Sequence, residues 1–235
     1  MAIGAGAVRE PGRGPAYREV AANLRELVVG GEYSPGDRLP GEAELCERFA
    51  VSRSTVREAI RTLEAQHLVI TTRGTTGGTF VAAPDPERLE GDLQVGLGLL
   101  TAADRVSVAQ IVEIRELLEA PTAALAAARR SEEQLAELRE LVHHDDHELF
   151  HLALIEAAGN ELIGAMTRPL LAVLNERLAR EHAPDEFWRQ VDDEHRRILA
   201  AVEAGDAAEA ECQMRLHLAT LKAEYPNLDT RVGPV

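Results

Sequence analysis

Residues 36–66 read GDRLPGEAELCERFAVSRSTVREAIRTLEAQ, and this stretch decides the fold of the first third of the chain. Residues 42–49 are predicted to form a short helix, because their apolar side chains return to one face of a 3.6-residue period. A tight turn at 50–52 follows, and residues 53–66 are predicted to form a second helix. The side chains expected inside are Leu45, Phe49, Val56, Ile60 and Leu63. Two helices joined by so short a turn indicate a helix-turn-helix unit.

The second predicted helix begins with features that suit contact with DNA. Ser52 is a suitable N-cap, and the free backbone N–H groups and positive dipole end behind it favour phosphate oxygens. Arg53, Arg57 and Arg61 recur every four residues, so three guanidinium groups share one face. Such arginines are usually a solvated surface. Here they follow a helix-turn unit and precede a basic-tipped hairpin, and the combination favours a DNA-reading role.

A β-hairpin is predicted after the second helix. The extended segments 68–72 and 79–82 are joined by the glycine-rich stretch 73–78. With a first helix at 16–30, the elements compose a winged helix-turn-helix.

The net charge of −15 is unevenly distributed along the 235 residues. Residues 1–83 carry 10 basic and 10 acidic residues, which leaves 15 basic and 30 acidic residues for the rest of the chain. The acidic second half is repelled by the phosphates of nucleic acid, so any DNA binding must come from arginines placed locally in the first domain.

We expect a disordered arm at 1–13, a DNA-binding domain at 14–83 and an all-helical domain at 84–235. Neither a signal peptide nor an 18-residue apolar run is present, so we expect a cytoplasmic protein without a membrane partner. The two cysteines, Cys46 and Cys212, are expected to be buried, reduced thiols.

The second half has the composition of a helical bundle, rich in Ala and Leu and without a credible strand. Pro121 and Pro169 fall inside helical patterns and predict kinks. Helices are predicted at about 86–100, 106–129, 132–142, 145–158, 161–182, 185–204 and 206–224. The fold class is therefore mainly α: a winged helix-turn-helix followed by an all-α bundle, whose core is a natural place for a ligand or a metal.

Histidines are the candidate chemistry of this bundle. His147 and His151 lie four apart on one predicted helix face, and His195 and His217 fall on two later helices. Four converging imidazoles suit a first-row transition metal, although each histidine alone is more often a half-exposed side chain with no common partner. Residues 147–151 also read H-E-x-x-H, the zinc-protease pattern with Glu148 activating water. The pattern is short and lacks its usual continuation, so a zinc hydrolase is the weaker alternative.

Several blocks of the first domain resemble the winged-helix domain of GntR-family transcriptional regulators. They are residues 35–40 (PGDRLP), 44–45 (EL), 51–59 (VSRSTVREA) and 78–81 (GTFV). The resemblance implies a dimer bound to double-stranded operator DNA. It implies contacts by Arg38, Ser52, Arg53, Ser54, Thr55 and Arg57, with Arg73 and Gly74 at the tip of the wing. Ala50 stands at a turn position often filled by Gly, where a left-handed backbone would cost about 1–2 kcal/mol.

The second half resembles the FCD domain, the ligand-sensing half of the FadR subfamily of GntR regulators. The blocks are residues 111–128 (IVEIRELLEAPTAALAAA), 150–151 (FH), 157–160 (AAGN), 194–195 (EH) and 217–218 (HL). Members ligate a divalent metal with one carboxylate and three histidines and bind small carboxylic acids beside it. The resemblance places His151, His195 and His217 as the three histidines and makes Arg115 a candidate anchor for the effector carboxylate.

The fourth ligand departs from the family pattern. The family's Asp lies four residues before the first histidine, where this chain has His147, and Asp146 is about 100° around the helix. We therefore expect His147 as the fourth ligand of an all-imidazole site holding zinc, with nickel or manganese as alternatives. The function expected is a repressor whose operator affinity is controlled by a small carboxylate. The alternative is a DNA-binding dimer with a purely structural helical domain.

Overall fold

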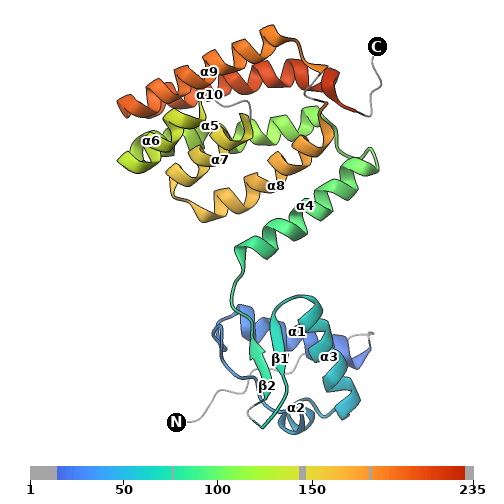
Figure 1. The fold of residues 1–235 in the computed structure, drawn as a ribbon. Helices are drawn as coiled ribbons and strands as arrows, with labels where there is room; N and C mark the ends of the chain where they lie inside the picture. Colours follow the sequence, from blue (N-terminus) through green and yellow to red (C-terminus); the bar gives the residue numbers. More distant parts are fainter. Residues whose placement is uncertain (1–14, 76, 143–146, 180–181, 231–235) are drawn as a thin grey trace. The chain divides into compact units, whose positions relative to one another are not determined.

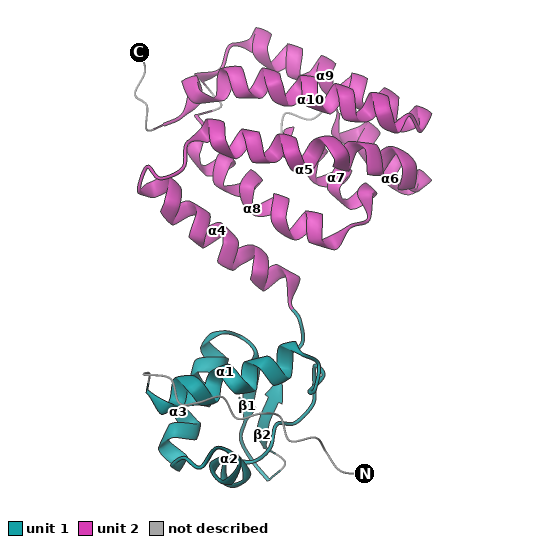
Figure 2. Ribbon diagram, turned by 180° about the vertical axis from the view of Figure 1, so that it is seen from behind, with its two compact units in different colours: residues 1–84 teal, residues 85–235 magenta. Residues whose placement is uncertain are grey.

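The computed structural model describes residues 15–75, 77–142, 147–179 and 182–230, and these fall into two compact units (Figures 1 and 2). Unit 1 comprises residues 1–84 and unit 2 comprises residues 85–235. The described residues contain ten α-helices and one two-stranded antiparallel sheet. This confirms the predicted fold class. The arm predicted at 1–13 lies outside the described residues.

Unit 1 is a three-helix core followed by a hairpin. Its elements are α1 (Ala16–Val29), α2 (Glu42–Phe49), α3 (Arg53–Ala65), β1 (Val69–Thr72) and β2 (Gly78–Val81). Helices α1 and α3 pack together, and α2 packs on α3. Leu24, Leu45, Val56 and Leu63 have no exposed surface and form the centre of this core. The predicted helix-turn-helix is therefore held by the apolar positions that the sequence period singled out.

The turn between α2 and α3 is tight because Ala50 adopts a left-handed conformation with φ 51° and ψ 44°. The backbone N–H of Val51 then bonds back to the carbonyl of Cys46 at 3.1 Å and ends α2. A Cβ in this region is disfavoured by about 1–2 kcal/mol. Ala50 is thus left-handed as the resemblance implied, and it holds this conformation at an energetic cost.

The wing is an antiparallel pair of strands with Val69 opposite Val81 and Thr72 opposite Gly78. The segment before α2 joins this sheet, since Arg38 forms an isolated bridge with Phe80. The wing is therefore fastened to the unit at its base.

Unit 2 is a bundle arranged around one central helix, α5. Its elements are α4 (Pro86–Ala102), α5 (Val108–Arg129), α6 (Glu132–Leu141), α7 (His147–Ala158), α8 (Glu161–Arg177), α9 (Asp185–Ala204), α10 (Ala207–Glu224) and the 3-10 turn η2 (Tyr225–Leu228). Helix α5 contacts α7, α8, α9 and α10, while α4 lies along α8 (Figure 1). Capping boxes at Ser107 and Ser131 set the starts of α5 and α6.

Two expectations from the sequence are corrected. The helix predicted at 161–182 ends at Arg177, because Arg177 and Leu178 pair with Asp229 and draw the chain out of the helical path. Cys212 is exposed rather than buried, and Cys46 is half-buried. Pro121 and Pro169 do lie inside helices, in α5 and α8. Across the described residues, no helix combines the length and apolar character needed to cross a membrane.

Candidate functional site

Hydroxyl groups gather at the start of α3. The Ser52 side chain accepts a hydrogen bond from the backbone N–H of Thr55 at 3.2 Å. Its Oγ also lies 2.8 Å from the hydroxyls of Ser54 and Thr55. The predicted N-cap is therefore in place, and it leaves an exposed polar helix terminus suited to a phosphate oxygen.

The three arginines of α3 differ in their partners. Arg57 is held by Glu42, whose carboxylate oxygens lie 2.9 and 3.0 Å from Nε, and Arg61 lies 3.3 Å from Glu58. Arg53 is exposed and makes no ion pair or hydrogen bond within the described part of the chain. The Arg53 guanidinium is therefore unengaged among the described residues, whereas Arg57 would have to leave Glu42 before it could meet another group.

Arg38 lies against the wing. Its Nη2 donates to the carbonyl of Gly77 at 2.6 Å. A side chain at Gly78 would place its Cβ 2.5 Å from the Arg38 Nε, so Gly78 allows this close approach. Arg73 and Gly74 are exposed at the tip, and Gly74 has φ +115°, which favours glycine. Arg38 thus stabilises the wing as well as adding positive charge beside it.

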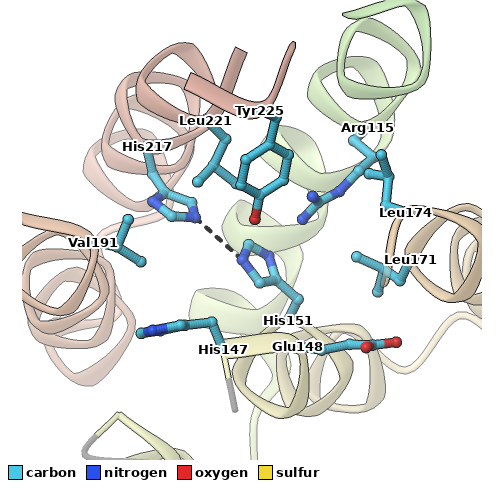
Figure 3. A pocket seen from close by; sticks show the side chains of 10 residues that line it. All are labelled: Arg115, His147, Glu148, His151, Leu171, Leu174, Val191, His217, Leu221 and Tyr225. Atoms are coloured by element: carbon cyan, nitrogen blue, oxygen red, sulfur yellow. Dashed lines mark hydrogen bonds between the residues drawn. The ribbon is translucent and has the colours of Figure 1, made fainter. Parts of the chain in front are cut away.

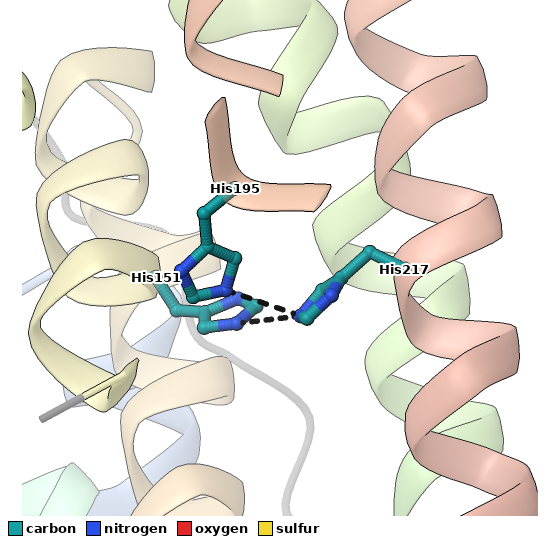
Figure 4. Close-up of side chains that lie close together, drawn as sticks. All are labelled: His151, His195 and His217. Carbon is teal, nitrogen blue, oxygen red and sulfur yellow. Dashed lines mark hydrogen bonds between the residues drawn. The ribbon is translucent and has the colours of Figure 1, made fainter. Parts of the chain in front are cut away.

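Three of the four predicted histidines meet in the core of unit 2 (Figure 4). His151 comes from α7, His195 from α9 and His217 from α10, and none is more than 3 % exposed. The Nε2 atom of His217 lies 3.2 Å from that of His151 and 3.3 Å from that of His195. Two nitrogens bound to one tetrahedral zinc at about 2.0–2.1 Å would be about 3.3–3.4 Å apart. The spacing therefore fits a shared metal ion.

Carboxylates hold the outer nitrogens of two of these rings. Glu194 Oε2 lies 2.9 Å from Nδ1 of His217, and Glu119 Oε2 lies 2.7 Å from Nδ1 of His151. A neutral imidazole carries one proton, and a carboxylate neighbour places that proton on Nδ1. The Nε2 atoms of His151 and His217 then present lone pairs to each other, an arrangement that a cation between them would stabilise.

The electrostatics of the cluster keep the imidazoles neutral, which is the form that binds metal. Burial lowers the pKa of His217 to about 4, with the neighbouring Glu194 opposing the shift only in part. Burial likewise lowers the pKa of His151 and places that of His195 well below its usual range. Glu119 stays ionised: burial alone would raise its pKa, but Arg115 and His151 lower it to about 2.

His147 lies beside this group rather than within it. The three clustered histidines each offer a nitrogen within 4.8 Å of the others. The His147 ring stacks on Trp188 with centroids 4.7 Å apart, and its Nδ1 lies 3.5 Å from Asp192 Oδ1. Its role as fourth ligand stays a prediction. Asp146 lies outside the described residues.

Arg115 is buried and lines a cavity of about 10 Å³ next to the histidines (Figure 3). Arg115 donates two hydrogen bonds to the Glu119 carboxylate, from Nε at 2.5 Å and from Nη2 at 3.1 Å. In Figure 3 the guanidinium and the Tyr225 hydroxyl turn toward the same part of the cavity. An effector carboxylate at Arg115 would therefore share this guanidinium with Glu119.

Glu119 and Glu194 are the site residues that reasoning from sequence missed. Glu119 follows Arg115 by four residues, the spacing of a helical ion pair, and this signal could have found it. Glu194 precedes His195 by one residue and so points elsewhere on α9, and only the packing of α10 brings it to His217. Glu148, the catalytic residue of the protease alternative, points away from the His147 ring (Figure 3).

Comparisons with known proteins match both halves of the chain. Residues 16–81 match the model described as bacterial regulatory proteins, gntR family, and residues 110–220 match the FCD domain. The HTH-type transcriptional regulator LutR of Bacillus subtilis (strain 168) is 33 % identical over 213 residues, covering 83 % of this chain and 94 % of that protein.

The Galactonate operon transcriptional repressor of Escherichia coli (strain K12) is 30 % identical over 206 residues, covering 81 % of this chain and 89 % of that protein. Among solved structures, Streptococcus agalactiae GntR superposes with a TM-score of 0.54 at 25 % identity. That match covers 88 % of this chain and 99 % of the other.

Proposed function

Because the chain belongs to the GntR family of bacterial transcription regulators and carries an FCD domain, we propose that a small carboxylate, bound beside a divalent metal, controls its affinity for operator DNA. As a transcription regulator, the chain is not an enzyme, so the zinc hydrolase alternative is set aside. The three converging Nε2 atoms of the bundle carry the proposal.

In the DNA-binding half, α3 would enter the major groove with its N-terminal residues facing the bases. Arg53 would reach a base or a phosphate, and the hydroxyls of Ser52, Ser54 and Thr55 would bind the backbone. Arg57 would join them after leaving Glu42. Arg73 and Gly74 would place the tip of the wing over the minor groove.

In the helical half, His151, His195 and His217 would hold the metal, with His147 as the fourth ligand. Imidazole nitrogens suit zinc, and nickel and manganese are the alternatives. When bound, the metal supplies positive charge that attracts an anionic ligand. Glu119 and Glu194 orient two of the imidazoles, and such outer partners tune metal affinity.

Effector binding would change the shape of the bundle, because the present cavity of about 10 Å³ holds no more than about one water molecule. A sugar acid or a short metabolic acid would have to separate α5, α7, α9 and α10 around Arg115. Such a change is a means of altering the spacing of two DNA-binding domains. The relative named for galactonate supports a sugar acid as the first compound to test.

A homodimer is proposed because a helix-turn-helix dimer reads two half-sites related by symmetry. Ile114 and Leu117 share one face of α5 and are 45 % and 63 % exposed, so a second copy covering them would remove apolar surface from water. Repression relieved by the effector is the proposed direction, because a change in dimer spacing readily disrupts binding to two fixed half-sites.

The test is operator affinity measured with and without the effector. An operator would be selected from random DNA, and its Kd measured by fluorescence anisotropy with added galactonate, lactate or acetate. We expect one acid to weaken operator affinity by about 5- to 150-fold. This effect of the acid should disappear when a chelator is added and in the His151→Ala variant. Tight binding indifferent to every acid and to the chelator would instead support the purely structural bundle.

A further inference from the structure

The surroundings of His147 repeat a pattern found at two of the clustered histidines. His151 and His217 each turn Nδ1 toward a carboxylate and Nε2 toward the centre. His147 also turns Nδ1 toward a carboxylate, with Asp192 Oδ1 at 3.5 Å. Its ring meets His195 edge-on with centroids 5.3 Å apart. The outer side of His147 thus faces a carboxylate, as in the two clustered histidines, but the pair is longer and makes no hydrogen bond in this structure.

One face of α9 supplies all of these neighbours. Trp188, Asp192 and His195 are spaced by four and three residues, so their side chains share a helix face. Trp188 lies nearly parallel to the His147 ring, with an angle of 7° between the planes, and limits rotation of the imidazole. The Asp192 carboxylate lies 3.5 Å from the His147 Nδ1, within ion-pair distance of it. The same helix therefore carries a metal ligand and the two groups that orient His147.

We infer that Asp192 is a positioning residue, which holds His147 in the tautomer and orientation that present Nε2 to the metal. This inference rests on the proposed metal site. Where the family pattern has a carboxylate bound directly to the metal, this chain would have His147 as the ligand, with the negative charge of Asp192 behind it. That charge would lie farther from the ion than the charge of a directly bound carboxylate. With Glu119 and Glu194, Asp192 would be the third carboxylate surrounding the cation, and it would favour retention of a divalent ion.

The experiment is a cobalt(II) titration of the full chain, with affinity measured by competition against a chelating dye and the visible spectrum recorded. Asp192→Asn keeps the shape of the side chain and removes its charge. The matched control is Asp193→Asn, because Asp193 is the next residue of α9, is exposed and pairs with Arg196. His147→Phe keeps a ring against Trp188 and removes the ligand nitrogen.

Asp192→Asn and His147→Phe are each expected to weaken cobalt binding by about 10- to 100-fold, and Asp193→Asn by less than about twofold. In the His147→Phe background, Asp192→Asn should have almost no further effect, and both variants should lose the same part of the cobalt spectrum.

An Asp192→Asn affinity equal to that of Asp193→Asn would overturn the inference. The inference would also be overturned if Asp192→Asn lowered cobalt affinity equally in the wild-type and the His147→Phe backgrounds. Failure of the metal site itself is distinguishable, because then wild type would bind no cobalt, or His151→Ala would bind it as tightly as wild type. Far-ultraviolet circular dichroism reports whether the helical bundle of each variant is folded, because the emission of Trp188 itself depends on the His147 ring that stacks on it.

Discussion

Replacing Glu119 by glutamine tests the buried charge network that surrounds the histidines. Glu119 is 2 % exposed and lies between two groups, the Arg115 guanidinium and the His151 imidazole. Glutamine is nearly the same size but has no charge. The substitution therefore leaves Arg115, which is also 2 % exposed, without this buried counter-charge.

The expected loss of folding free energy can be worked out from the pKa of the Glu119 carboxyl group. Its neighbours lower the pKa of Glu119 from 4.5 to about 2, and at about 1.36 kcal/mol per pH unit this gap corresponds to about 3 kcal/mol of folding free energy. Removing one partner from a buried ion pair costs about 3–5 kcal/mol, which agrees. We expect Glu119→Gln to lower the free energy of unfolding by about 3 kcal/mol at neutral pH.

The pH dependence has a definite sign. Because the pKa of Glu119 is lower in the folded state, its contribution is complete above pH 4.5 and is lost as the pH falls toward 2. The difference in unfolding free energy between wild type and Glu119→Gln should therefore narrow steadily below pH 4.5.

The assay is urea unfolding of metal-free protein, followed by tryptophan fluorescence. Trp188 is the only tryptophan and lies in α9, so the signal reports the helical domain. The control is Glu116→Gln on the same helix, where the carboxylate lies 3.6 Å from Arg215 near the surface and contributes about 0–1 kcal/mol. A loss below about 1 kcal/mol for Glu119→Gln, or a difference that stays constant down to pH 3, would refute this reasoning.

Three further predictions concern the DNA-binding domain. Arg53→Ala should weaken operator binding by about 1–3 kcal/mol, measured by fluorescence anisotropy, and an unchanged Kd would mean that α3 docks in another register. Ala50→Gly should stabilise the winged helix by about 1 kcal/mol, because φ 51° suits glycine, and an unchanged or lower Tm by calorimetry would count against it. Gly78→Ala should weaken operator binding without affecting cobalt affinity, because its methyl group would lie 2.5 Å from Arg38 Nε; equal DNA affinity would show that the wing tolerates the displacement.

Local patterns in the sequence predicted the elements of the fold well. Ser52 caps α3 as predicted, and Ser107, Ser131, Asn160 and Asp206 cap the helices that follow them in the same way, because side chains of this kind satisfy free N–H groups. Apolar spacing likewise predicted the burial of Leu45, Val56, Ile60 and Leu63, while Phe49, also expected inside, is only partly buried. These features depend on neighbours within a few residues, so the sequence alone was sufficient.

Contacts between distant residues were beyond the reach of the sequence. The helix ending at Arg177 was predicted too long, because its end depends on Asp229, 52 residues later. The pairing of Arg57 with Glu42 joins two helices whose packing no local pattern encodes. The candidate metal site was predicted in part: the resemblance indicated the histidines, while their outer carboxylates became visible only after α5, α7, α9 and α10 were packed.

The most direct measurement is metal content per chain, by elemental mass spectrometry, for untagged protein purified without chelator beside its His195→Ala variant. We predict about one divalent metal per wild-type chain and a large loss of metal in the variant, with DNA binding retained. A wild type without metal, or a variant with undiminished metal, would contradict a metal-based sensor in the helical domain.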